Sequence, residues 1–314
     1  MALGPDRLRA AVTLAVYGLL LVVTGQLALV VAPLPVAVAV ARGRNRFALA
    51  LFAAIVAAGM ASVIGVMGLL VSGILGAAAG WGIRRRMPYT ALVTGVAFLA
   101  LALNAMSLAV RWDATVEEVD ASYEALDLQL KNAADKGLSE QAIANLTVRQ
   151  WLLGHWQDVY LGITFAGMLV LSCIVVSATV KWLTLRAHTQ AARTFTTFQT
   201  PDWLVWCLIA VAAFWYLDYT TEVSSMRFVS WNAGFALIGA YWLNGLAILM
   251  HAVAAMRPNA LILAVLVAGM VFFGLAPMLA FVGLFDTWGD FRPRIDRLLA
   301  ARQEAEDADD DNAH

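Results

Sequence analysis

Long apolar runs without internal charge constrain this chain more than any other feature. They cover residues 10–41, 47–82, 89–110, 159–180, 203–217, 228–250 and 260–285. No Asp, Glu, Lys, Arg or His lies in the middle of any of these runs. Because one helical span of a bilayer needs about 20 apolar residues, the pattern predicts an all-α polytopic transmembrane bundle. The two longest runs exceed one span each, so we expect about seven to nine hydrophobic segments.

The composition supports a chain embedded in lipid. Of the 314 residues, 61% are hydrophobic and 14% are charged, whereas a soluble domain carries about 25% charged residues. The formal net charge is −1, so no basic field is present to attract nucleic acid. Cys173 and Cys207 lie inside apolar runs and are expected to be buried small hydrophobes. The run after Arg7 and Arg9 is longer than the core of a signal peptide, so we expect a retained span.

The first two runs are predicted to be divided. Pro33 and Pro35 each remove a backbone donor and restrict the preceding residue, so residues 10–41 should form a full helix followed by a short, broken one. Residues 47–82 should form two closely packed helices. Gly76 and Gly80 have the Gly-x-x-x-Gly spacing that lets helix backbones approach closely. Packing within the chain is the simpler interpretation of this spacing, and a dimer face is the alternative.

The flanking charges predict an orientation in the membrane. Three basic segments are expected on the cytoplasmic side, at residues 42–46, 84–86 and 181–193. Residues 112–148 carry eight acids against two lysines and are expected to face outward. The pattern is that of a multi-pass protein of the bacterial cytoplasmic membrane.

We divide the chain into four parts on this basis. They are N-terminal membrane helices (1–111), an acidic extracytoplasmic helical hairpin (112–150), C-terminal membrane helices (151–288), and a charged interfacial turn with a disordered acidic tail (289–314). The sequence contains conflicting signals about which side of the membrane the C-terminus lies on. Counting spans places it outside, whereas its arginines favour the cytoplasm. An incomplete crossing by residues 203–217, or a re-entrant pair broken at Pro277, would place it inside, which we favour.

The acidic part has a helical pattern of its own. Ser139 is placed to N-cap a second helix, with Leu138 and Ile143 as a hydrophobic staple. Two short helices that pack together within the chain are the simpler interpretation, and an intermolecular coiled coil is the alternative. The apolar residues of the first helix follow a heptad spacing, at Trp112, Val116, Val119, Tyr123, Leu126 and Leu130.

The chain lacks the residue patterns of intramembrane hydrolases and ion-coupled carriers. Coupling to a proton or ion usually needs an ionisable group inside the membrane. The motifs GxSxG and HExxH and paired intramembrane aspartates are absent from the sequence. We therefore predict no catalytic residue, no metal site and no cofactor. Polar residues within the runs are candidates for helix–helix hydrogen bonds or for a cavity lining, namely Gln26, Asn104, Ser107, Asn232 and Asn244.

A dense group of opposite charges follows the last run. Asp286 and Asp290 are four residues apart and would share one helix face, and Pro293 is expected to break that helix. Arg292 can then pair with both acids, so these three residues are predicted to form one ion-paired unit beside Trp288 at the membrane face. We interpret the group either as a clamp at the membrane exit or as a contact for a partner protein or polar ligand group.

Three stretches in the last third carry a common pattern. They are PDWLVWCLIAVAAFWYL (201–217), WNAGFALIGAYWLNGLAILMHAV (231–253) and GLFDTWGDFRPR (283–294). The pattern resembles the YybS-like family of uncharacterised polytopic bacterial membrane proteins. Its positions here are Pro201, Trp203, Asn232, Gly245, Asp286, Trp288, Asp290, Phe291 and Arg292. The hydrophobic layout of that family is similar to that of substrate-binding subunits of energy-coupling-factor vitamin transporters, which implies solute binding with energy supplied by another protein.

We therefore expect an integral membrane protein that is a non-catalytic small-molecule-binding or permease-like subunit without its own energy coupling. The alternative is a membrane scaffold or assembly factor that binds other proteins through residues 112–150 and the C-terminal turn. The expected partners are the lipid bilayer and either a partner membrane protein or a second copy of the chain. The candidate ligand or partner residues are Asn104, Asn232, Asn244, Asp286, Trp288, Asp290 and Arg292.

Overall fold

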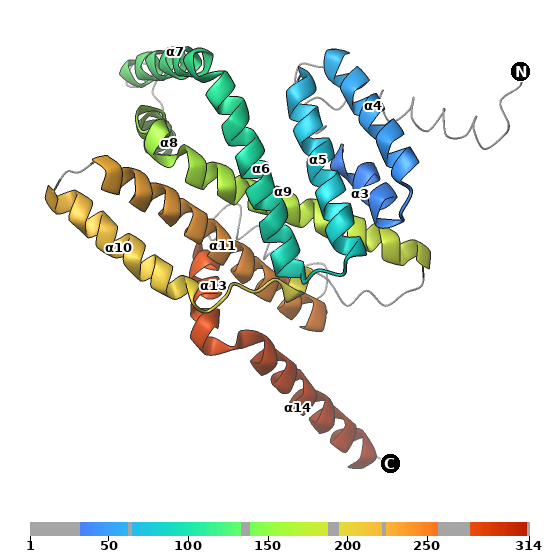
Figure 1. Cartoon of the computed structure of the whole chain (residues 1–314). Helices are drawn as coiled ribbons and strands as arrows, with labels where there is room; N and C mark the ends of the chain where they lie inside the picture. Colours follow the sequence, from blue (N-terminus) through green and yellow to red (C-terminus); the bar gives the residue numbers. More distant parts are fainter. Residues whose placement is uncertain are drawn as a thin grey trace, which may run out of the picture.

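The computed structural model describes residues 32–61, 65–132, 139–187, 195–221, 224–256 and 277–312. Within these ranges the chain forms α-helices and one short 3-10 helix, η2, and no strand (Figure 1). The predicted all-α class is therefore confirmed. In chain order the elements are α3 (Pro33–Ala41), α4 (Asn45–Ala61), α5 (Gly65–Arg84), α6 (Tyr89–Val110), α7 (Trp112–Lys131), α8 (Glu140–Gly154), α9 (Trp156–Ala187), η2 (Phe195–Thr197), α10 (Leu204–Thr221), α11 (Ser224–Met256), α13 (Met278–Gly289) and α14 (Phe291–Asn312).

Four of the described helices are long and apolar enough to cross a membrane. The qualifying stretches are Tyr89–Val110, Trp156–Thr184, Leu204–Thr221 and Ser225–Met256. Three further apolar helical stretches are shorter, at Asn45–Ala57, Gly68–Arg84 and Met278–Gly289. The expected seven to nine spans are therefore not confirmed. Residues 10–31, 62–64 and 260–276 of the apolar runs lie outside the described ranges.

Helices α3, α4 and α5 pack against one another. Pro33 and Pro35 lie in the first turn of α3, where a missing backbone donor removes no intrahelical hydrogen bond. The backbone of α5 contacts that of α3. A Cβ atom on Gly76 would collide with the carbonyl oxygen of Pro33, and one on Gly80 with that of Ala37. The Gly-x-x-x-Gly pair thus serves packing within the chain, and α4 and α5 are the two helices expected here.

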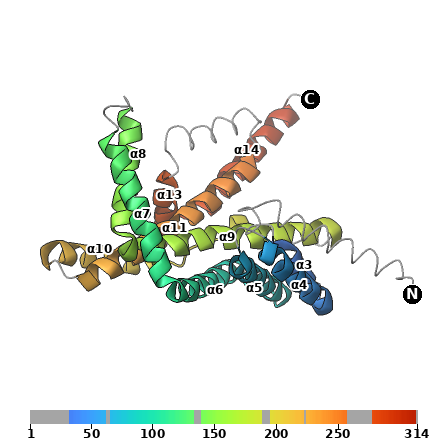
Figure 2. The same cartoon turned by 90° about the horizontal axis from the view of Figure 1, so that it is seen from above.

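The largest core lies where α6, α9 and α11 meet. Both α6 and α11 pack along α9 (Figures 1 and 2). The side chains of Val93, Leu169, Val176 and Leu243 are buried between them. Burial of such side chains in a helical bundle fixes the three helices relative to one another.

Two further helices, α10 and α13, pack on α11. Glycines bring α13 and α11 into backbone contact. A Cβ atom on Gly245 would collide with the carbonyl oxygen of Leu279, and one on Gly283 with that of Tyr241. This reciprocal contact sets where α13 crosses α11, and so places the residues that follow it.

The helices α7 and α8 form the expected hairpin (Figure 1). The Ser139 hydroxyl accepts a hydrogen bond from the Ala142 N–H at 3.3 Å and caps α8. Between the helices, Gln150 Nε2 donates to Asp127 Oδ1 at 3.0 Å. A hydrogen bond from Lys131 lowers the pKa of Asp127. None of the residues described in α7 and α8 is buried, so the two helices cover each other only in part.

The C-terminal segment differs from the sequence expectation in three ways. Asp290 ends α13 in the left-handed conformation, with φ of 43°, so it does not continue the helix face of Asp286. Pro293 lies in the first turn of α14, where proline starts a helix well, and it does not break one. The backbone is helical as far as Asn312, where we expected a disordered acidic tail. Residues 300–306, AARQEAE, have high helix propensity and favour a helix over that part of the segment.

Three segments that join helices gather at one end of the bundle. The α3–α4 turn lies beside the α5–α6 turn, since a Cβ atom on Gly43 would be 3.5 Å from Arg84 Nη1. The segment before α10 reaches the start of α6, where the Gln199 N–H donates to Thr90 Oγ1 at 3.2 Å. Arg292, at the start of α14, contacts the same segment. The basic turns and the start of α14 therefore share one end.

Candidate functional site

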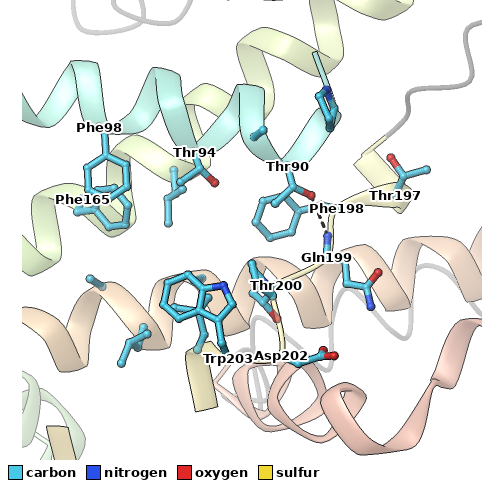
Figure 3. Close-up of a pocket in the computed structure, with 18 residues that line it drawn as sticks. Thr90, Thr94, Phe98, Phe165, Thr197, Phe198, Gln199, Thr200, Asp202 and Trp203 are labelled. Atoms are coloured by element: carbon cyan, nitrogen blue, oxygen red, sulfur yellow. Dashed lines mark hydrogen bonds between the residues drawn. The ribbon is translucent and has the colours of Figure 1, made fainter. Parts of the chain in front are cut away.

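A cavity of about 750 Å³ lies between α6, α9, α11 and the segment that leads into α10 (Figure 3). One end of it is apolar. The rings of Phe98 and Phe165 pack there with centroids 4.7 Å apart. Leu169 and Leu237 extend this apolar surface. From Thr90 to Phe98 the lining follows α6 for eight residues, which corresponds to a length of about 12 Å along the helix.

The opposite end of the cavity is polar. Gln199, Thr200 and Asp202 line it there, at the end away from the two phenylalanines (Figure 3). Thr90 and Thr94 of α6 add two hydroxyl groups. Asp202 is the one ionisable side chain among the described lining residues. The cavity thus offers a long apolar surface and hydrogen-bonding groups at one end.

The polar end is formed by residues 198–203, which we call the wall segment. It has neither helix nor strand. The Phe198 side chain is 2% exposed and anchors the segment in the core. The Gln199 N–H reaches Thr90 of α6, as described above. Trp203, at the other end of the segment, is 61% exposed and lines the cavity.

A buried ion pair lies directly behind the wall segment. Arg292 Nη1 donates to Asp286 Oδ2 at 3.0 Å. Arg292 Nη2 donates to the Phe198 carbonyl at 2.7 Å and to Asn244 Oδ1 at 3.1 Å. Both side chains of the ion pair are largely buried, at 14% and 4% exposed. One guanidinium therefore joins the C-terminal segment, α11 and the wall of the cavity.

The Asp286 carboxylate is held from several sides. Its Oδ1 accepts the Phe291 N–H at 2.9 Å, and Asn244 Nδ2 lies 3.4 Å from Oδ2. Asn244 Nδ2 also donates to the Gly283 carbonyl at 2.9 Å. Burial lowers the pKa of the Arg292 guanidinium from its ordinary value, and the adjacent carboxylate opposes that shift. Arginine stays charged in proteins, so the pair is a charge-assisted contact.

Two of the predicted C-terminal candidates lie outside this network. Among the described residues, the exposed Asp290 carboxylate makes no hydrogen bond or ion pair. The predicted three-residue unit is therefore wrong at Asp290, because the helix ends before it. Trp288 is 62% exposed. Asn244 takes the place that we had given to Asp290, although it is 42 residues earlier than Asp286.

The other two asparagines join α9 to its neighbours. Asn232 Oδ1 accepts the Gly162 N–H at 2.8 Å, and its Nδ2 donates to the Asp158 carbonyl at 2.6 Å and the Phe228 carbonyl at 2.8 Å. Asn104 Oδ1 accepts a hydrogen bond from the Tyr160 hydroxyl. Both contacts are helix–helix hydrogen bonds of the kind expected, and neither residue lines the cavity described above.

The lining residues themselves were not among the predicted candidates. Phe198, Thr94 and Thr200 come from parts of the chain that are far apart in sequence, and neither their spacing nor their type distinguishes them. The available signal was the Pro201-x-Trp203 entry to a span, which lies within the lining. Over the described residues, no group of three or more His, Cys, Asp and Glu side chains lies close enough to hold a metal ion.

The helices and the cavity together define a multi-helix membrane protein with a partly open cavity of ligand size between its helices. Residues 10–287 match the family model described as "Predicted membrane protein (DUF2232)". The chain therefore belongs to this family of predicted membrane proteins of unknown function, which agrees with the resemblance noted from the sequence. No curated protein and no solved structure matches the chain.

Proposed function

We propose that this protein is a non-catalytic membrane subunit that binds an amphipathic small molecule between α6, α9, α11 and the wall segment. The main observation that supports this proposal is the cavity. Its volume of about 750 Å³ is within the usual range of ligand sites, roughly 300–1,000 Å³. Its polar groups gather at one end of an apolar lining, which suits a molecule with an apolar body and a polar head.

The distribution of charge supports binding without energy coupling. Asp202 is at the polar end, and the apolar length of the described lining carries no ionisable group. A carrier driven by protons or ions usually has such a group within the membrane. A permease-like role would therefore need a second membrane protein to supply energy, and we propose the bacterial cytoplasmic membrane as the place where the two meet.

A variant that fills the cavity tests this function. Ala91 is exposed and lines the cavity, so Ala91→Trp would occupy the space without displacing core residues. Ala102 is also exposed on α6 and is not part of the lining, so Ala102→Trp is the matched control. The proteins would be purified in mild detergent and extracted for mass spectrometry.

We expect one small molecule to be enriched with the wild type and with Ala102→Trp, and to be depleted with Ala91→Trp. Equal enrichment in all three proteins would place the molecule outside the cavity. Enrichment in none of them, relative to a membrane protein purified in the same way, would argue against small-molecule binding.

A scaffold function is the second candidate, and one observation favours it. The α7–α8 hairpin has large apolar side chains exposed, among them Leu128 at 62% and Val148 at 58%. Apolar groups on a polar helical pair often contact another protein. Purification that yields a stoichiometric protein partner, lost in a Leu128→Ser, Val148→Ser variant, would support this role.

A further inference from the structure

We propose that Arg292 is a positioning residue that fastens the wall of the cavity to the C-terminal helices. The proposal rests on the proposed function, because it assigns a role at the same site. It goes further by making α14 part of the control of that site. The guanidinium would hold the polar end of the cavity in its present arrangement, and withdrawal of α14 would release the wall segment.

The wall segment depends on contacts to other elements for its position. It lacks the repeated backbone hydrogen bonds of a helix or strand. Its backbone is hydrogen-bonded to the adjoining elements η2 and α10. Beyond these neighbours in the chain, two hydrogen bonds in the described structure tie its backbone to other helices. One is from the Gln199 N–H to Thr90 Oγ1 on α6 at 3.2 Å. The other is from Arg292 to the Phe198 carbonyl at 2.7 Å. The second is charge-assisted, and such bonds are about twice as strong as neutral ones.

The geometry of the guanidinium makes this contact specific to arginine. Its Nη1 is held by Asp286 while its Nη2 points at Phe198 and Asn244. A planar group can direct two donors at separate acceptors at once. A lysine ammonium is a compact point charge on a flexible stem, so it can keep the pair with Asp286 without reaching the carbonyl of Phe198. The two roles of Arg292, ion pair and wall contact, can therefore be separated.

The helix α14 is attached to the bundle mainly at its start. Beyond Arg292, His251 Nε2 lies 2.9 Å from Asp296 Oδ1, and the Asp296 side chain is 61% exposed. An ion pair this exposed contributes little. Figure 1 shows α14 projecting away from the other helices. A force on α14 would therefore act on the cavity chiefly through the one buried guanidinium.

The test compares Arg292→Lys with the wild type in a protein that carries Thr200→Cys and Cys207→Ser. Thr200 is 4% exposed and belongs to the wall segment. Native Cys173 is 5% exposed in the core and serves as the internal control for general loosening. Both thiols would be followed by mass spectrometry during labelling with a hydrophilic maleimide, without added ligand.

We expect Arg292→Lys to speed labelling at residue 200 by about tenfold or more, the ratio that corresponds to one lost hydrogen bond to a charged group. Labelling of Cys173 should stay near the wild-type rate, and the melting temperature should fall by only a few degrees, as one lost hydrogen bond implies. An unchanged rate at residue 200, or an equal rise at both thiols, would overturn the proposal. Because labelling needs no ligand, its result is independent of the co-purification test of the proposed function.

Discussion

At the scale of single residues, the Asp286 carboxylate shows why a charge can lie inside a membrane protein. It is 4% exposed and accepts hydrogen bonds from the Phe291 N–H and Arg292. Asn244 approaches the same carboxylate from α11. A buried ion pair gives little net stability against apolar residues, but removal of one partner leaves a buried charge uncompensated.

The first prediction concerns that uncompensated charge. We expect Arg292→Ala to destabilise the protein by about 3 kcal/mol or more, because it leaves the Asp286 carboxylate buried without a counter-charge. The double variant Asp286→Asn, Arg292→Gln removes both charges and should melt at a higher temperature than Arg292→Ala. Thermal unfolding in detergent would measure both. Asp290→Asn is the control, since the exposed Asp290 contributes no ion pair among the described residues, and it should melt like the wild type.

The second prediction compares two asparagines that join α9 to its neighbours. Asn232 makes three hydrogen bonds to backbone groups, whereas Asn104 accepts one from Tyr160. Asn232→Ala should therefore lower the free energy of unfolding by about 1–3 kcal/mol, and Asn104→Ala by less. If the two variants lose the same stability, the hydrogen bonds of Asn232 are not what holds α11 on α9.

At the scale of helices, the crossing of α11 and α13 leaves no room for a side chain. Gly245 and Gly283 each face a backbone carbonyl of the other helix. The same device joins α3 to α5 through Gly76 and Gly80. In lipid the hydrophobic effect does not drive helices together. Small residues stabilise their association by allowing close van der Waals contacts.

The third prediction follows from this close contact. Gly245→Ala and Gly283→Ala should each prevent α13 from docking and reduce the yield of folded protein in detergent, measured by size-exclusion chromatography. The matched controls are Gly95→Ala on α6 and Gly167→Ala on α9, because a Cβ atom on either glycine meets no atom within 4 Å. Those two changes should leave the yield unchanged or raise it slightly, since alanine favours a helix by about 1 kcal/mol.

The sequence predicted helices better than it predicted their ends and their contacts. Apolar runs, the Gly76-x-x-x-Gly80 spacing and the Ser139 cap are local patterns. Within the described ranges the apolar runs are almost entirely helical, and the two glycines and the cap have the expected contacts. The position of the helix break after α13 was predicted wrongly, because two nearby residues, Asp290 and Pro293, can each interrupt a helix. Pro293 is the stronger breaker in sequence, yet the chain turns at Asp290, in a left-handed conformation that aspartate tolerates better than most residues.

The site was predictable only in part for a related reason. Asp286 and Arg292 are close in sequence, so their pairing could be expected. Asn244 was a candidate, but its contact with Arg292 joins residues 48 apart. The Phe198 carbonyl is a backbone group, and no residue type signals its role. The cavity depends on how four separate segments pack, which hydrophobic periodicity does not specify.

At the scale of the whole molecule, the charged segments separate to opposite ends. The basic turns adjoin the start of α6, and the acidic hairpin follows its last residue, Val110. A helix of 22 residues separates these ends by about 33 Å, slightly more than the hydrocarbon thickness of a bilayer. Excess Lys and Arg favours the cytoplasmic side. Because α14 starts at the basic end, the C-terminus should lie on that side as well.

The fourth prediction tests this arrangement by cysteine labelling in intact cells, with Cys173→Ser and Cys207→Ser as the background. Ser139→Cys in the hairpin should react with an impermeant maleimide added outside. Asn45→Cys in the basic turn and Glu304→Cys on α14 should react only after the membrane is permeabilised. Reaction of Glu304→Cys from outside would show that the C-terminus is on the other face, and reaction of Asn45→Cys would reverse the whole orientation.

The contact between Phe198 and Arg292 joins residues 94 apart in the chain. A ribosome therefore completes the four candidate spans found among the described residues, the last of which ends at Met256, before it makes Arg292. A chain terminated early, between residues 256 and 292, would carry enough hydrophobic helix to be inserted and yet have an unfastened cavity. The truncated product and the finished protein would both be hydrophobic enough for insertion. They would differ in whether the wall segment has its contact with the buried Arg292 guanidinium.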